Sequence, residues 1–157
     1  HSIMAISLKE GDRAPFFRGI NQEGKEISLN DYKGKKIILY FYPKDNTSGC
    51  TAEACSLNDN YDTLTKLGYE VIGVSPDAPG SHQKFIAKYN LGFQLIADTE
   101  KKILQDYGVW GEKSMYGRKY MGVFRTTFLI DGNGIIERVF TKVDTKNAAE
   151  QIIKSLD

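Results

Sequence analysis

The chain has 157 residues, with 21 lysine and arginine residues against 20 acidic ones and a formal net charge of +1. This length suits one domain, residues 1–157, with a substantial core, and so balanced a charge argues against a nucleic acid or a membrane surface as the main partner. No apolar run is long enough to span a bilayer. Two cysteines do not make a disulfide scaffold, so a reducing compartment, the cytoplasm, is expected.

The chain starts with His1-Ser2-Ile3 before Met4, which we interpret as the remnant of an expression vector. This start has no pattern of a secretory signal. In chain order we expect strands at 16–20 and 25–29 forming a small hairpin, a strand at 37–41, a helix at 52–67, a strand at 69–75, a helix at 81–89, a strand at 94–97, a helix at 99–107, strands at 125–130 and 135–141, and a helix at 146–156.

Two further segments complete the prediction. Residues 108–122 are rich in glycine and aromatic residues and are predicted to be a long loop. The turn sequence Asp131-Gly132-Asn133-Gly134 predicts a hairpin, and therefore an antiparallel pair in the sheet. Because helices and strands otherwise interleave, the expected fold class is α/β, with a mixed central sheet and helices on both faces.

Cys50 lies where the apolar strand at 37–41 gives way to a helix. The first turn of a helix has backbone N–H groups without partners and carries the positive end of the helix dipole. An anion is stabilised there, so a thiol at this place should lose its proton more easily. The sequence therefore predicts that Cys50 is a reactive thiolate.

The residues around Cys50 carry a recognisable pattern. Pro43-x-x-x-Thr47-x-x-Cys50 resembles the active-site signature of the peroxiredoxins, and Cys50-Thr51-Ala52-Glu53 with the second cysteine, Cys55, resembles their bacterioferritin-comigratory, or Q-type, branch. The likeness extends from Gly11 to Asp131. One departure is Ser48, which stands where the family often has proline.

The resemblance implies a thioredoxin-like fold with an added N-terminal hairpin, and a peroxidase that reduces hydrogen peroxide and organic hydroperoxides. It implies thioredoxin, or a similar dithiol protein, as the reductant. The family branch is mostly monomeric, and a dimer is left open. The chemistry needs no metal and no organic cofactor, because the thiolate attacks a peroxide oxygen directly and becomes a sulfenic acid.

Each residue of the pattern has an expected role. Cys50 attacks the peroxide, and the Thr47 hydroxyl holds the peroxide and the thiolate. Arg125 supplies a permanent cation that stabilises the sulfur and the leaving oxygen. Pro43 restricts the loop and shields the site. By resemblance, Glu53 orients Arg125 through a paired hydrogen bond.

Cys55 raises a geometric problem as the partner that resolves the sulfenic acid. Five residues along an α-helix advance about 7.5 Å and turn the side chain away. A disulfide needs Cα atoms about 4.4–6.8 Å apart. Cys50 and Cys55 therefore cannot bond while the helix is intact, and we predict that about Thr51 to Ser56 unfolds locally on oxidation.

Two other functions remain open from the sequence. A thioredoxin-like disulfide oxidoreductase would have two residues between its cysteines, whereas four lie between these. A redox sensor or holdase needs the same reactive thiol as an enzyme, so the sequence does not separate the two. His82 is expected at a solvated helix end. Trp110 and Tyr116 are candidates for the wall of the peroxide pocket.

Overall fold

The computed structural model describes residues 6–157, so the expected vector remnant at residues 1–3 lies outside the described part. The strands are β1 (Arg18–Asn21), β2 (Glu26–Ser28), β3 (Lys36–Phe41), β4 (Tyr69–Ser75), β5 (Gln94–Ala97), β6 (Trp110–Met115), β7 (Arg118–Val123), β8 (Thr126–Ile130) and β9 (Ile136–Phe140). The helices are α1 (Ser48–Asp59), α2 (Tyr61–Lys66), α3 (Pro79–Tyr89), α4 (Lys102–Asp106) and α5 (Ala148–Ser155), with short 3-10 turns η1 (Leu29–Tyr32) and η2 (Thr145–Asn147).

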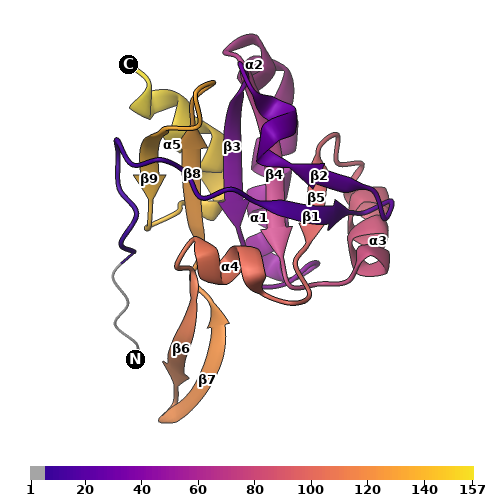
Figure 1. The fold of residues 1–157 in the computed structure, drawn as a ribbon. Helices are drawn as coiled ribbons and strands as arrows, with labels where there is room; N and C mark the ends of the chain where they lie inside the picture. Colours follow the sequence, from indigo (N-terminus) through magenta and orange to yellow (C-terminus); the bar gives the residue numbers. More distant parts are fainter. Residues whose placement is uncertain (1–5) are drawn as a thin grey trace.

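Seven strands form one sheet in the order β2-β1-β5-β4-β3-β8-β9 (Figure 1). The strands β3, β4 and β5 are parallel, whereas β8 runs antiparallel to β3, and β9 runs antiparallel to β8. The β1–β2 hairpin is joined to this sheet at β5 through β1. The predicted mixed sheet and its N-terminal hairpin are therefore confirmed.

The central strand β3 is buried on both faces, as its apolar sequence predicts. Ile37, Leu39 and Phe41 point into one core, which also holds Leu104 of α4. The alternate residues of β3 point into the second core, which is filled from α1, α2, α3 and α5. This alternation follows from the period of two in a strand. Helices thus cover both faces of the sheet, as expected.

The predicted loop at 108–122 is wrong, because most of it forms the two-stranded hairpin β6–β7, which projects from the body in Figure 1. Its turn has positive φ at Tyr116 (51°) and Gly117 (78°), the backbone of a type I′ hairpin turn. The first four residues of β7 are all exposed. A strand without a buried face has no alternation of apolar and polar residues, and this is why the pattern did not predict it.

The predicted helix at 52–67 is two helices. The first, α1, begins at Ser48, four residues earlier than predicted, and ends where the Asn60 side chain donates a hydrogen bond to the carbonyl of Ser56 (2.8 Å). The earlier start places Cys50 inside the first turn. Among the described residues, no helix has the length and apolar character that a membrane crossing requires.

Candidate active site

The loop between β3 and α1 brings Cys50 to the carboxyl end of the parallel strands. Thr47 is the N-cap of α1, with extended backbone (φ −96°, ψ 160°), and the N–H of Thr51 donates the first helical hydrogen bond, to the carbonyl of Thr47. The N–H groups of residues 48–50 precede that bond and carry the positive end of the helix. Cys50 is therefore in the environment predicted for it, with 2 % of its surface exposed.

Arg125 reaches Cys50 because β8 is antiparallel to β3. In the register of these strands Phe41 faces Thr126, so the start of β8 lies beside the end of β3. Arg125 immediately precedes β8, and its Nη2 donates a hydrogen bond to the Cys50 sulfur at 3.3 Å. Its guanidinium also lies against Gly49, where an added Cβ would come within 3.3 Å of Nη2. A guanidinium at this distance stabilises the negative charge of a thiolate.

Glu53 holds the other side of the same guanidinium. Its Oε1 accepts a hydrogen bond from Arg125 Nη1 at 2.7 Å, and only 1 % of the residue is exposed. Burial raises the pKa of Glu53 to about 7, although the Arg125 charge and hydrogen bond act in the opposite direction. Burial would lower the pKa of Arg125, but Glu53 and Cys50 outweigh it and the pKa is raised, so Arg125 remains a cation.

Pro43 and Thr47 belong to the loop before α1, and Thr47 is exposed. The Thr47 hydroxyl donates to the carbonyl of Lys44 at 2.8 Å, which leaves the lone pairs of its oxygen as acceptors. Such an oxygen can accept a hydrogen bond from the O–H group of a hydroperoxide. Pro43 is half-buried in the loop. Ser48 is the first residue of α1, a position that also suits proline, so the departure from the family pattern leaves the helix start intact.

Cys55 lies in the same helix as Cys50, and both cysteines are free thiols. Burial, together with the nearby charge of Asp59, raises the pKa of the Cys55 thiol, which disfavours its thiolate while the helix is formed. Both residues belong to the continuous helix Ser48–Asp59. The geometric conflict predicted from their spacing is therefore present in this structure.

The sequence did not single out Lys113, which is next to this site. Its Nζ donates to the carbonyl of Val123 at 2.8 Å and lies over the Phe124 ring, just before Arg125. Burial and the Arg125 charge lower the pKa of Lys113, and Cys50 raises it. Lys113 comes close to this site because it belongs to β6, and the sequence predicts a loop there, so the sequence does not identify it.

Two sequence-based interpretations are wrong. His82 is not at a solvated helix end: it is completely buried, with hydrogen bonds to Asp45 (2.7 Å) and to the carbonyl of Ile96 (2.9 Å). Tyr116 is 98 % exposed at the turn of the β6–β7 hairpin, so it does not wall a pocket. Trp110, at the start of β6, is partly buried against the core and stays a candidate.

The arrangement suits chemistry that begins with attack by a thiolate. A buried sulfur at a helix start, with a fixed cation at hydrogen-bond distance, is a stabilised nucleophile. The same guanidinium has further donors for the negative charge that develops on a leaving oxygen. The reaction that uses both is attack of a thiolate on a peroxide bond.

Comparison with known proteins agrees with this chemistry. Residues 10–139 match the model of the AhpC/TSA family. The putative peroxiredoxin bcp of Coxiella burnetii is 45 % identical over 151 residues, which cover 96 % of this chain and all of the relative. Peroxiredoxin Bcp of Escherichia coli K12 is 43 % identical over 149 residues, covering 95 % and 96 % of the two chains.

Solved structures give the same relationship. A PrxQ mutant from Xylella fastidiosa has a TM-score of 0.88 and 30 % identity, covering 99 % of this chain and 97 % of that one. Peroxiredoxin Q of Xanthomonas campestris has a TM-score of 0.84 and 32 % identity, covering 89 % of both chains. The chain therefore belongs to the AhpC/TSA family, as a thiol-dependent peroxidase of its Bcp/PrxQ branch.

Proposed function

We propose that Cys50 is the thiol that reduces hydrogen peroxide and organic hydroperoxides. The thiolate attacks one peroxide oxygen, the O–O bond breaks, and the sulfur becomes a sulfenic acid. The other oxygen leaves as alkoxide or hydroxide and takes up a proton. The observation that carries this assignment is the 3.3 Å hydrogen bond from Arg125 to the Cys50 sulfur, at the start of α1.

The neighbouring residues assist this step. Arg125 stabilises the thiolate and the leaving oxygen, and Glu53 holds the guanidinium in place through its 2.7 Å hydrogen bond. The Thr47 oxygen accepts a hydrogen bond from the hydroperoxide, which orients the O–O bond toward the sulfur. Pro43 shields the site on its exposed side. No resident metal or organic cofactor is required.

Cys55 then resolves the sulfenic acid. Its thiol attacks the oxidised sulfur, water leaves, and a Cys50–Cys55 disulfide forms within one chain. Because α1 separates the two residues, about Thr51 to Ser56 unwinds for this step. A dithiol protein, thioredoxin, returns the disulfide to two thiols. We place this cycle in the cytoplasm, in a chain that acts as a monomer.

Mass spectrometry after one equivalent of hydrogen peroxide tests the assignment directly. We expect one intramolecular Cys50–Cys55 disulfide per chain, and a sulfenic acid on Cys50 that a nucleophilic trap captures when Cys55 is replaced by serine. Steady-state peroxide consumption with a thioredoxin system should require Cys50. If the Cys50→Ser variant kept its turnover, the assignment would be wrong.

The same measurements separate the two other candidate functions. A disulfide oxidoreductase would reduce protein disulfides without consuming peroxide. A sensor or holdase would form the disulfide without sustained turnover. Steady turnover with peroxide and a dithiol reductant distinguishes the peroxidase from both.

A further inference from the structure

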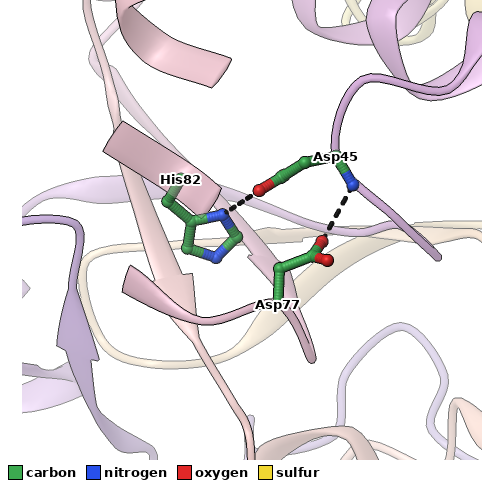
Figure 2. Close-up of side chains that lie close together, drawn as sticks. All are labelled: Asp45, Asp77 and His82. Carbon is green, nitrogen blue, oxygen red and sulfur yellow. Dashed lines mark hydrogen bonds and ion pairs between the residues drawn. The ribbon is translucent and has the colours of Figure 1, made fainter. Parts of the chain in front are cut away.

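The loop that carries Thr47 is bonded to α3 and to the end of β4 by polar side chains that the proposed chemistry does not use. The side chains of Asp45, Asp77 and His82 lie close together, as Figure 2 shows, and Asp45 and His82 are buried. Asp45 belongs to the loop, His82 to α3, and Asp77 follows β4. Asp45 is two residues from Thr47 and five from Cys50, so a shift of Asp45 would move the peroxide site.

Both ring nitrogens of His82 face oxygen atoms. Nε2 lies 2.9 Å from the carbonyl of Ile96, which can only accept, so Nε2 carries a hydrogen. Nδ1 lies 2.7 Å from Oδ2 of Asp45, a contact that also requires a shared hydrogen. Through these two contacts His82 connects Asp45 of the loop to the backbone of β5.

Asp45 is bonded on every side. Oδ1 accepts from the Tyr42 hydroxyl at 2.6 Å, and Oδ2 accepts from the Ser81 hydroxyl at 2.8 Å as well as from His82. Burial alone would raise the pKa of Asp45, but the hydrogen bonds from His82, Tyr42 and Ser81 outweigh it and lower the pKa, so the carboxylate is ionised. Its backbone N–H donates to Asp77 Oδ2 at 2.8 Å.

The spacing of these three side chains would also suit a metal ion, since their ligand atoms all lie within 4.8 Å of one another. The hydrogen bonds favour a different interpretation. Both nitrogens of His82 and both carboxylate oxygens of Asp45 already have protein partners, and Asp77 Oδ2 also accepts from the Ser75 hydroxyl at 2.7 Å. The cluster is satisfied as a hydrogen-bond network.

The helix α3 holds the next loop residue as well. Asn46 has left-handed backbone (φ 60°), and its side-chain oxygen accepts from Tyr89 (3.2 Å) and Lys88 (3.3 Å), both on α3. The loop is thus fixed to α3 at two consecutive residues just before Thr47. Pre-organised residues at this place hold a substrate site in its productive geometry.

We propose that the buried His82–Asp45 pair is a positioning device for the peroxide-binding loop, which sets where Thr47 meets the hydroperoxide relative to Cys50. This inference rests on the proposed function, because it assumes that Cys50 reacts with the peroxide. His82 is bonded to Asp45 and to the carbonyl of Ile96, whereas the sulfur is bonded to Arg125, so the pair should affect the reaction with peroxide and leave the intrinsic reactivity of the thiol unchanged.

Two isosteric substitutions separate the two bonds of His82. In His82→Asn the amide nitrogen takes the place of Nδ1 and can still donate to Asp45. In His82→Gln it takes the place of Nε2 and can donate only to Ile96. All chains carry Cys55→Ser, so that Cys50 is the single thiol. Gln83→Ala is the matched control, since Gln83 is on α3 but donates to the carbonyl of Gln22.

Each chain is measured for the second-order rate of Cys50 oxidation by hydrogen peroxide and for the rate of Cys50 alkylation by iodoacetamide. We expect His82→Gln to slow oxidation by about tenfold or more, with alkylation within about twofold of the Cys55→Ser parent. His82→Asn and Gln83→Ala should oxidise within about threefold of that parent.

Equal oxidation rates in His82→Gln and the parent would overturn the inference, and so would a parallel fall in alkylation or equal rates in the Asn and Gln variants. If His82→Gln does not fold, Ser81→Ala is the second test, because it removes the hydrogen bond from the Ser81 hydroxyl to Asp45. This variant should slow oxidation of Cys50 about two- to fourfold. An unchanged rate would overturn the inference. A parent that does not react with peroxide would instead contradict the proposed function.

Discussion

Glu53 is a buried carboxylate whose ionisation should cost stability near neutral pH. It is 1 % exposed, and burial raises its pKa to about 7 against the effect of Arg125. A carboxyl whose pKa is raised by folding makes the folded state more stable when it is protonated than when it is ionised. That stability is complete below its ordinary pKa of 4.5 and is lost as the pH rises through about 7.

The magnitude follows from the shift. One pKa unit corresponds to about 1.4 kcal/mol, so the change from 4.5 to about 7 costs about 3 kcal/mol once the carboxyl is ionised in both states. Part of this loss has already occurred at pH 5. Between about pH 5 and about pH 8.5 the remaining loss is about 2.5 kcal/mol.

The substitution Glu53→Gln removes the titration and keeps an oxygen that can accept from Arg125. We expect the free energy of unfolding of the Glu53 chain to fall by about 2.5 kcal/mol relative to the Gln chain between these two pH values. Urea unfolding at both pH values measures it. Both chains should carry Cys50→Ser, so that the neighbouring thiol does not titrate. A difference between the chains that is the same at both pH values would refute the reasoning, because Glu53 would then be ionised throughout.

Three further predictions concern the same region. Arg125→Lys keeps the charge but loses the planar guanidinium that contacts Cys50 and Glu53 together. The second-order rate of Cys50 oxidation, measured by stopped-flow kinetics, should therefore fall by about 10- to 150-fold. A rate within twofold of the parent would contradict this prediction. Among the described residues Tyr40 has a buried hydroxyl without a hydrogen-bond partner, so Tyr40→Phe should raise the free energy of unfolding by about 1 kcal/mol in urea titrations, whereas a fall would indicate that the hydroxyl is bonded. Backbone hydrogen exchange of Thr51–Ser56 should be faster in the oxidised protein than in the reduced one; equal protection would exclude local unwinding.

The sequence alone predicted the sheet well, because its strands have clear patterns. The run from Ile37 to Phe41 is apolar throughout and is buried on both faces, and the predicted strand at 69–75 has the bounds of β4. The pattern does not predict the hairpin β6–β7, because neither strand alternates between buried and exposed residues: β6 is mostly half-buried and β7 is mostly exposed. Only the backbone of its turn, with left-handed residues at Tyr116 and Gly117, identifies it as a hairpin.

The site could be predicted only in part, because its residues come from distant segments. Cys50 and Arg125 are 75 residues apart in sequence, and their contact depends on the register of β3 and β8. The hydrophobic pattern does not predict this register, so Arg125 was identified only through the family resemblance. His82 was placed in solvent because it has no charged neighbour in sequence. Its partner Asp45 is 37 residues away, so the pair exists only in the folded chain.

The burial of Glu53 connects attack on the peroxide with the later opening of α1. With both thiols free, Arg125 is bonded to Glu53 on one side and to Cys50 on the other, so its guanidinium links two residues in the first turns of α1. In the proposed cycle, oxidation of Cys50 to the sulfenic acid adds an oxygen to the sulfur that accepts one of these bonds. The proposed unwinding of about Thr51 to Ser56 would return Glu53 to water, which would recover about 3 kcal/mol at a pH above 7 and offset part of the cost of exposing this turn. The Glu53 titration should therefore act mainly on formation of the proposed Cys50–Cys55 disulfide, because that is the step for which we propose that this turn unwinds.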